Sequence, residues 1–231
     1  MRPTVLLFDI DGTLITTGGV GRRAITGAVQ ELFGRGDAFM GFTFDGMTDQ
    51  RIVREGLKAI GVTATPRHIA EVLAAYLRHL EREVAEADPA RYRVHPGMHA
   101  AIDAAHARGF AVGLGTGNIR DGARLKLGKV GLFERFDFGG FGDDHEEREK
   151  LIRAGAERGA QRLGVTLEEA NVIVIGDTPK DIAAAHAIGG RCFAVGTGSW
   201  KAGQLREHKA DWAFDDLAVP GALETLMNPP P

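Results

Sequence analysis

Two aspartates separated by one residue follow directly after a short apolar stretch near the N-terminus. Residues 4–8 are Thr-Val-Leu-Leu-Phe, and Asp9, Ile10 and Asp11 come next. In an extended chain, residues i and i+2 point to the same side, so we expect the two carboxylates to lie together. Neighbouring carboxylates repel, and at least one pKa rises unless a cation intervenes. We therefore interpret Asp9 and Asp11 as a reactive or metal-binding pair rather than as solvated aspartates.

A second apolar stretch ends in the same way. Residues 172–176 precede Asp177, and Asp181 follows four residues later. Carboxylate oxygens are the hard ligands that Mg²⁺ prefers. The carboxyl ends of parallel strands form the ligand-binding edge of an open α/β sheet. We therefore expect Asp177 and Asp181 to join Asp9 and Asp11 around a divalent metal ion.

A third stretch supplies groups that suit an anion. Thr116, Gly117 and Asn118 follow residues 111–115, combining a hydroxyl group with flexible backbone at the expected start of a helix. Free backbone N–H groups at a helix start bind anions, although such loops also serve as plain turns. Arg148 or Lys150 could add a cation, or could form surface salt bridges with nearby glutamates. An anion beside magnesium is most simply a phosphoryl group.

The elements that must position these groups alternate along the chain. Short apolar strands are expected at Thr4–Phe8, Ala111–Leu114, Val172–Ile175, Arg191–Val195 and, as a last short strand, Asp211–Phe214. Helical patterns separate the later strands, at 99–108, 120–130, 148–163 and 180–188. Alternating helices and short apolar strands indicate βαβ units around a parallel sheet. The sequence therefore predicts the α/β class.

The segment between the first two strands differs from the rest. It has no convincing strand but three amphipathic helical patterns, at Gly21–Phe33, Asp49–Ile60 and Arg67–Val84. A length of 231 residues suits one core domain with a smaller module. We expect an α/β core formed by residues 1–15 and 90–231, with an all-helical insertion at 16–89.

Composition excludes several classes of protein. The net charge is −3 and no long basic run occurs, so no nucleic-acid partner is expected. Cys192 is the only cysteine, which excludes an internal disulfide and a cysteine-based zinc site. The apolar stretch 5–8 is too short for a secretory signal, and none approaches the ~20 residues of a membrane span. We expect a cytoplasmic protein without a membrane partner, as a monomer or homodimer.

Together, these motifs resemble the haloacid dehalogenase superfamily, in its phosphoglycolate-phosphatase-like branch with a helical C1-type cap. Its four motifs occur in order at 8–14, at 115–118, at Arg148 or Lys150, and at 176–181. The resemblance covers essentially the whole chain. It implies a Rossmann-like three-layer core with a parallel sheet, and identifies the inserted helices as the cap.

The resemblance also implies roles for the aspartates. Asp9 is expected to attack phosphorus and form an aspartyl-phosphate. Asp11 is expected to protonate the leaving oxygen and then deprotonate the attacking water. The implied cofactor is Mg²⁺, bound by Asp9, the backbone carbonyl of Asp11 and Asp177, with Asp181 completing or supporting the site.

The phosphate-binding roles follow in the same way. The Thr116 hydroxyl and the amides of Gly117 and Asn118 are expected to bind the phosphoryl oxygens. The stretch ending at Arg148 resembles, with altered spacing, an Asp-His-x-x-Arg pattern of this branch. Arg148 is therefore favoured over Lys150 as the cation.

The resemblance implies a magnesium-dependent phosphatase acting on a small phosphomonoester, either phosphoglycolate-like or a sugar phosphate. A phosphomutase of the same superfamily would keep all four motifs and remains an alternative. A dehalogenase would not need Asp11 as acid and base. A catalytically silent binding module should have lost Asp9, Asp11 or Asp177, and all three are present.

Substrate selection is expected to belong to the insertion. Thr17, Gly18 and Gly19 lead into it and could form a hinge or line the pocket. Asp45 and Met47 lie in the loop before its second helix, within a stretch that resembles a cap element of phosphoglycolate-phosphatase-like proteins. These five residues are the candidates for substrate specificity.

Overall fold

The computed structural model describes residues 2–229, and a six-stranded parallel sheet forms its centre. The strands are β1 (Thr4–Phe8), β4 (Ala111–Gly115), β5 (Gly139–Gly140), β6 (Asn171–Gly176), β7 (Arg191–Val195) and β8 (Trp212–Phe214). Their order is β5-β4-β1-β6-β7-β8, and all neighbours run parallel. The predicted α/β class with a parallel sheet is confirmed.

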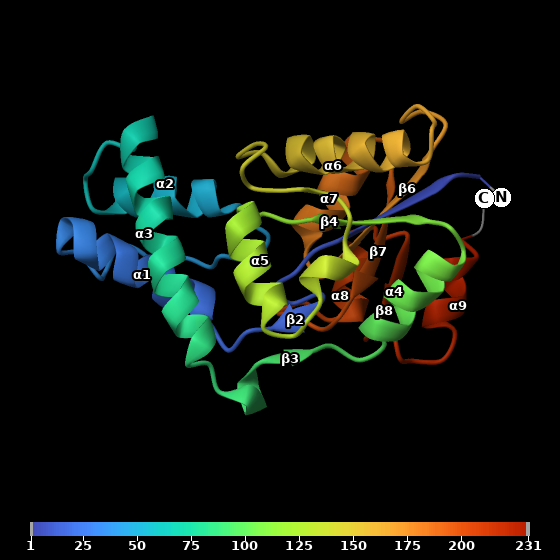
Figure 1. The fold of residues 1–231 in the computed structure, drawn as a ribbon, viewed down its shortest axis with the longest axis horizontal. Helices are drawn as coiled ribbons and strands as arrows, with labels where there is room; N and C mark the ends of the chain where they lie inside the picture. The colour runs from blue at the N-terminus through green and yellow to red at the C-terminus, as the bar shows by residue number, and fades with distance from the viewer. Residues whose placement is uncertain (1, 230–231) are drawn as a thin grey trace.

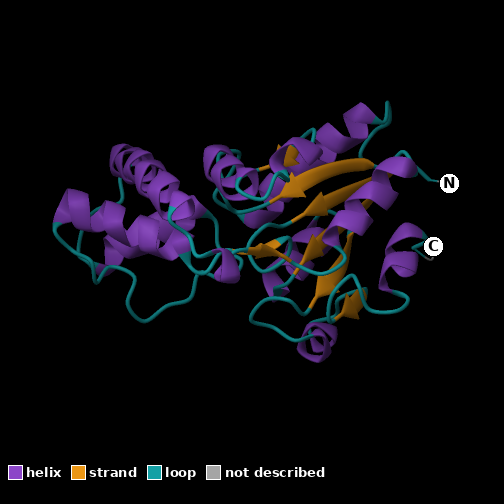
Figure 2. Cartoon of the chain, turned by 60° about the horizontal axis from the view of Figure 1, so that its bottom comes forward, coloured by secondary structure: helices purple, strands orange, loops and turns teal. Residues whose placement is uncertain are grey.

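Helices cover both faces of this sheet (Figure 2). Leu6 and Phe8 of β1 pack in one apolar cluster, while Val5 and Leu7 pack in another. The first cluster includes residues of α4 (Met98–Ala107), α5 (Arg120–Gly128) and α9 (Ala222–Met227). The second includes residues of α6 (Arg148–Arg162), α7 (Pro179–Ala187) and α8 (Ala202–Glu207). Successive strand residues point to opposite faces, so one apolar strand serves two helical layers.

The three helices predicted near the N-terminus form a group beside the sheet (Figure 1). They are α1 (Val20–Phe33), α2 (Asp49–Ala59) and α3 (Pro66–Ala85). Thr48 and Thr65 begin the second and third by accepting backbone N–H bonds, and Pro66 occupies the first turn of α3. Buried apolar side chains recur at helical spacing on each. The three helices predicted from the amphipathic patterns are therefore confirmed.

A two-stranded antiparallel ribbon joins this helical group to the sheet. Strand β2 (Ile15–Thr16) pairs with β3 (Arg93–Val94), so that Ile15 lies opposite Val94. The turns η1 (Pro89–Arg91) and η2 (Phe133–Arg135) are short 3₁₀ segments. Because the chain leaves and returns at the ribbon, we propose that residues 1–15 and 90–231 are the core and that 16–89 are the cap; of these, residues 1, 230 and 231 lie outside the described part of the chain.

Among residues 2–229, no helix is both long and apolar enough to cross a bilayer.

Candidate active site

The predicted site residues follow the ends of three neighbouring strands. Asp9 follows β1, the loop from Thr116 follows β4, and Asp177 follows β6. The Asp9 backbone N–H donates to the Ile175 carbonyl at 2.9 Å, which places Asp9 beside the end of β6. A cavity of about 290 Å³ opens over these strand ends, lined by residues of both the sheet edge and α1–α3.

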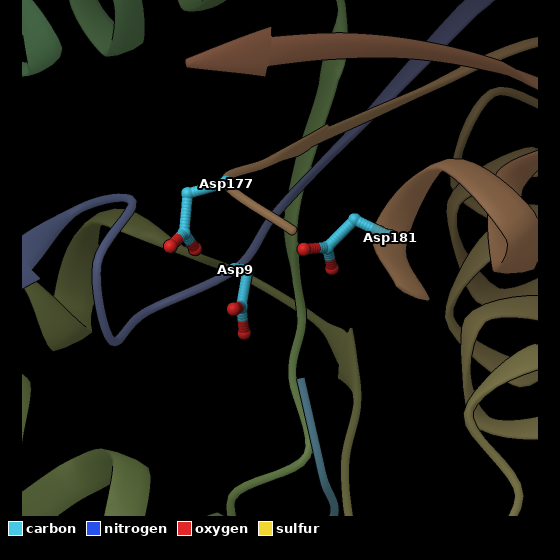
Figure 3. Close-up of side chains that lie close together, drawn as sticks. All are labelled: Asp9, Asp177 and Asp181. Atoms are coloured by element: carbon cyan, nitrogen blue, oxygen red, sulfur yellow. The ribbon is translucent and has the colours of Figure 1, made fainter. Parts of the chain in front are cut away.

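Three buried carboxylates converge beneath this cavity (Figure 3). Oxygen atoms of Asp9, Asp177 and Asp181 lie within 4.8 Å of one another. Burial raises the pKa of Asp9 to about 6 even though Arg148 opposes the shift, and repulsion by Asp181 adds to it. Burial also raises the pKa of Asp177 well above its ordinary value, and repulsion by Asp181 and Asp9 adds to it. Three such oxygen donors, of which two carry raised pKa values, fit a hard divalent metal ion.

Arg148, rather than Lys150, lies against these carboxylates. Arg148 begins α6 and is only 8% exposed. Its Nη2 lies 3.2 Å from Asp9 Oδ1 and 2.5 Å from Asp181 Oδ1. Burial opposes its charge, but the two carboxylates raise its pKa further above the ordinary value. The Lys150 side chain is 52% exposed and pairs with Glu147 instead, at 2.8 Å.

Asp181 lies behind the other two carboxylates and does not line the cavity. Its Oδ2 accepts hydrogen bonds from the Thr178 backbone N–H at 3.0 Å and from the Thr178 hydroxyl at 2.7 Å. This reciprocal capping box begins α7. Because Arg148 bonds to Oδ1, both oxygens of Asp181 have partners, which fits a supporting place better than a direct one.

Asp177 is held by the first motif. The Thr13 hydroxyl donates to Asp177 Oδ1 at 3.0 Å, and Thr13 is fully buried. A Cβ at either Gly12 or Gly198 would overlap the Asp177 carboxylate. These glycines therefore permit two loops to close tightly around this side chain.

Thr116 lies beneath its loop, whereas Gly117 and Asn118 line the cavity. The Thr116 hydroxyl accepts from the Asn118 backbone N–H at 3.3 Å and from Asn118 Nδ2 at 2.9 Å. It thereby fixes the turn and the Asn118 amide. The structure thus gives Thr116 a position that orients Asn118.

Four of the five specificity candidates also line the cavity: Thr17, Gly19, Asp45 and Met47. Gly18 does not. Gly18 and Gly19 have φ angles of 62° and 84°, in the left-handed region that favours glycine. Gly19 is the N-cap of α1, so the predicted hinge position coincides with a backbone turn.

The loop before α2 rests on the sheet edge. The Asp49 backbone N–H donates to the Gly117 carbonyl at 2.8 Å, and the Thr48 hydroxyl donates to the Glu146 carbonyl at 2.9 Å. Lys180 Nζ donates to the Asp45 carbonyl at 2.8 Å. Bonds to two core loops and to the first turn of α7 therefore place this segment above the acidic cluster.

A protein-family model described as haloacid dehalogenase-like hydrolase matches residues 3–189. The chain belongs to the haloacid dehalogenase-like hydrolases. The family expected from the four motifs is confirmed, and with it the expectation that the chain is an enzyme. No curated protein matches the chain.

Solved structures share this hydrolase's fold at low sequence identity. A beta-phosphoglucomutase from Clostridium difficile aligns with a TM-score of 0.72 and 15% identity, over 98% of this chain and 97% of its own. A hydrolase from Pseudomonas syringae gives 0.69 and 18%, over 93% and 94%. A predicted phosphoglycolate phosphatase from Haemophilus somnus 129pt gives 0.65 and 18%, over 94% and 96%. These likenesses show a shared fold.

In this haloacid dehalogenase-like hydrolase, Asp11 is paired with a lysine that sequence analysis missed. Lys126 Nζ on α5 lies 2.6 Å from Asp11 Oδ2 and 2.6 Å from Asn118 Oδ1. Asn118 Nδ2 also donates to Asp11 Oδ2, at 2.9 Å. Lys126 is only 4% exposed. The signal available in the sequence was a charged residue on the apolar side of a predicted helix, three residues after Ala123.

Several residues of the helical group line the cavity without having been predicted there, and Asp49 and Tyr76 are the two whose polar groups matter most. Asp49, in the first turn of α2, accepts a bond from the Ile119 backbone N–H at 2.9 Å, and burial raises its pKa to about 6. Tyr76 of α3 was interpreted only as part of an apolar pattern. Both side chains face the same cavity as Asp9 and Asp11.

Proposed function

We propose that this chain is a magnesium-dependent phosphatase that hydrolyses a small phosphomonoester through an aspartyl-phosphate on Asp9. One observation carries the proposal: Asp9 lies in a buried carboxylate cluster, 3.2 Å from Arg148, and opens onto a cavity lined by Gly117 and Asn118. This arrangement combines a nucleophile, a cation and anion-binding amides at one point.

The residues present would divide the metal-binding and phosphate-binding work. Asp9, Asp177 and the backbone carbonyl of Asp11 would hold Mg²⁺, with Asp181 supporting through Arg148. When bound, the ion would stabilise negative charge on Asp9 and on the phosphoryl oxygens. Backbone amides of the 116–118 loop would bind the same oxygens.

The covalent step would begin with Asp9. One of its carboxylate oxygens attacks phosphorus, and the bond to the leaving oxygen breaks. Asp11 gives that oxygen a proton, so the product leaves as an alcohol. Asp11 then takes a proton from water, which attacks the aspartyl-phosphate and releases inorganic phosphate. Arg148 neutralises part of the charge throughout.

A phosphomutase is the second candidate, and one observation favours keeping it. The likeness to the Clostridium difficile beta-phosphoglucomutase extends over nearly the whole of both chains. A mutase returns the phosphoryl group to its product instead of passing it to water. Free phosphate released in stoichiometric amounts from a sugar phosphate would therefore exclude it.

The decisive experiment uses p-nitrophenyl phosphate with Mg²⁺ and then with EDTA. We expect turnover only with the metal, and a loss of at least about 10³-fold in kcat for Asp9→Asn, because the covalent route is removed. Thermal unfolding of Asp9→Asn should show a folded protein, since the change removes a buried charge. Metal-independent turnover, or full activity in Asp9→Asn, would contradict the proposal.

A further inference from the structure

Gly21, the second residue of α1, lines the cavity and carries no side chain there. A Cβ built on Gly21 would lie 3.2 Å from Lys126 Nζ and 3.9 Å from Tyr76 Oη. All three residues line the cavity that contains Asp9. Polar groups from α5 and α3 therefore converge on the cavity beside Gly21, where even a Cβ would be crowded.

The Tyr76 hydroxyl has no protein partner there. The residue is only 1% exposed, and within residues 2–229 its hydroxyl makes no hydrogen bond. Every fully enclosed polar side-chain atom in this range does have a partner, so the hydroxyl must face the cavity. Burial raises the pKa of Tyr76 well above its ordinary value, and the charges of Asp49 and Asp11 add to this. The group therefore stays a hydrogen-bond donor, and an unpaired donor in such a place is unfavourable without a ligand or water.

Lys126 offers a second donor to the same space. Its ammonium group has three protons, and two are directed to Asp11 Oδ2 and Asn118 Oδ1. The third proton has no partner among the described residues. A single oxygen atom above Gly21 could accept hydrogen bonds from both Lys126 and Tyr76.

The surrounding charges decide which oxygen fits. Asp49 and Asp11 are the acidic groups that act on the Tyr76 hydroxyl, and Lys126 is the cation beside it. Arg148 lines the same cavity but is paired with Asp9 and Asp181. The guanidinium of Arg22 already donates to two backbone carbonyls. A carboxylate would be repelled by Asp11 and Asp49. A hydroxyl carries no charge, and its own proton can be given to a nearby carboxylate.

We propose that Lys126, Tyr76 and the part of the cavity beside Gly21 form a subsite for a hydroxyl group of the leaving alcohol. The substrate is then the phosphate ester of a polyol or sugar rather than of a hydroxy acid. The inference rests on the proposed phosphatase function.

Three phosphate esters test the subsite: sn-glycerol 3-phosphate, n-propyl phosphate, which lacks the hydroxyls, and 3-phosphoglycerate, in which a carboxylate replaces one hydroxymethyl group. We expect the wild-type kcat/KM to be highest for glycerol 3-phosphate. Tyr76→Phe should lower the ratio of kcat/KM for glycerol 3-phosphate over propyl phosphate about 2- to 10-fold, the worth of one hydrogen bond.

Gly21→Ala tests the part of the cavity beside Gly21 independently. Alanine favours a helix at this position, so the variant should fold, while its Cβ crowds Lys126 Nζ. The same ratio should fall. Gly203→Ala on α8 is the matched control, because a Cβ there meets no atom within 4 Å, and its ratio should equal that of the wild type.

The outcomes separate the subsite from the phosphatase proposal. Magnesium-dependent turnover of p-nitrophenyl phosphate, combined with an unchanged ratio in Tyr76→Phe, would overturn the subsite alone. A wild-type preference for 3-phosphoglycerate would overturn it as well. Absence of turnover with every ester would overturn the proposed function, and the subsite with it.

Discussion

The state of Asp9 depends on the cations beside it. Burial alone favours the protonated acid, which is a poor nucleophile, and the pKa of Asp9 stands at about 6 despite Arg148. Arg148 contacts Asp9 and Asp181 at once, so it joins the proposed nucleophile to a residue in the first turn of α7. A second positive charge, on a metal ion at Asp177, would complete the ionisation of Asp9. The metal ion and Arg148 would then both keep the Asp9 carboxylate charged.

Replacement of Arg148 should separate the two candidate cations. We expect Arg148→Gln to lower kcat for p-nitrophenyl phosphate at least about 100-fold, because charge stabilisation at the phosphoryl group is lost. Lys150→Gln should stay within about 2-fold of the wild type, since exposed salt bridges contribute little. Steady-state kinetics of both variants measure this. A larger loss in Lys150→Gln would show that the assignment is wrong.

The sequence identifies those site residues whose neighbours in the chain already indicate a functional position. Asp9 and Asp177 stand at the ends of apolar strands, and this local context is enough to single them out. Lys126 and Tyr76 sit within ordinary helical patterns. Their place in the site arises only because α5 and α3 pack across the same cavity, and a pattern within one helix does not contain that information.

Helix α6 carries Arg148 at its first position, and glycines set its distance from the sheet. A Cβ on Gly140 of β5 would overlap the Leu151 carbonyl of this helix, and a Cβ on Gly155 would come within 2.7 Å of the Gly140 nitrogen. The backbones of α6 and β5 therefore touch. This contact fixes where the guanidinium of Arg148 can reach.

Gly140→Ala should test this contact. We expect the free energy of unfolding to fall by about 1–3 kcal/mol, the usual cost of overpacking, with a loss of activity as α6 shifts. Gly128→Ala, at the end of α5, has no atom within 4 Å of its Cβ and should be neutral or slightly stabilising. Urea unfolding followed by circular dichroism compares the two. Equal stability of both variants would contradict the close-contact interpretation.

Apolar periodicity predicts the long helices and strands, but not the elements of two residues. Helix α6 was predicted at 148–163 and is observed at Arg148–Arg162, because its pattern extends over four turns. Strand β5 consists of Gly139 and Gly140 and carries no apolar signal, although it extends the sheet beyond β4. The ribbon strands β2 and β3 have two residues each. Such short elements form because neighbouring backbone is available, which only tertiary structure reveals.

For the whole molecule, metal binding and folding should be linked through pH. The pKa of Asp9 is about 6 in the folded chain, against an ordinary 3.8, and burial raises that of Asp177 well above the same ordinary value. Between these values the folded, metal-free protein holds protons that the unfolded chain has released. Its stability from these groups is therefore greatest below pH 4 and falls as pH rises through about 6.

Mg²⁺ should reverse this loss, because it binds the ionised carboxylates. We expect the rise in Tm on adding Mg²⁺ to be small at pH 5, to grow through pH 6, and to be largest at pH 7–8. Differential scanning fluorimetry with and without the metal isolates this effect from other titrating groups. Asp177→Asn should abolish the rise. A larger rise at pH 5 than at pH 8 would refute the linkage.

The β2–β3 ribbon has a consequence for how such an enzyme can diversify. The chain leaves the ribbon at Thr16 and returns to it at Arg93, opposite its point of departure. The register of β1 with β4 and β6 therefore does not depend on how many residues lie between. Insertions, deletions or wholesale replacement of the intervening segment would leave the proposed phosphate-binding groups in place. Selection can then alter which alcohol is accepted while the hydrolytic apparatus is inherited unchanged.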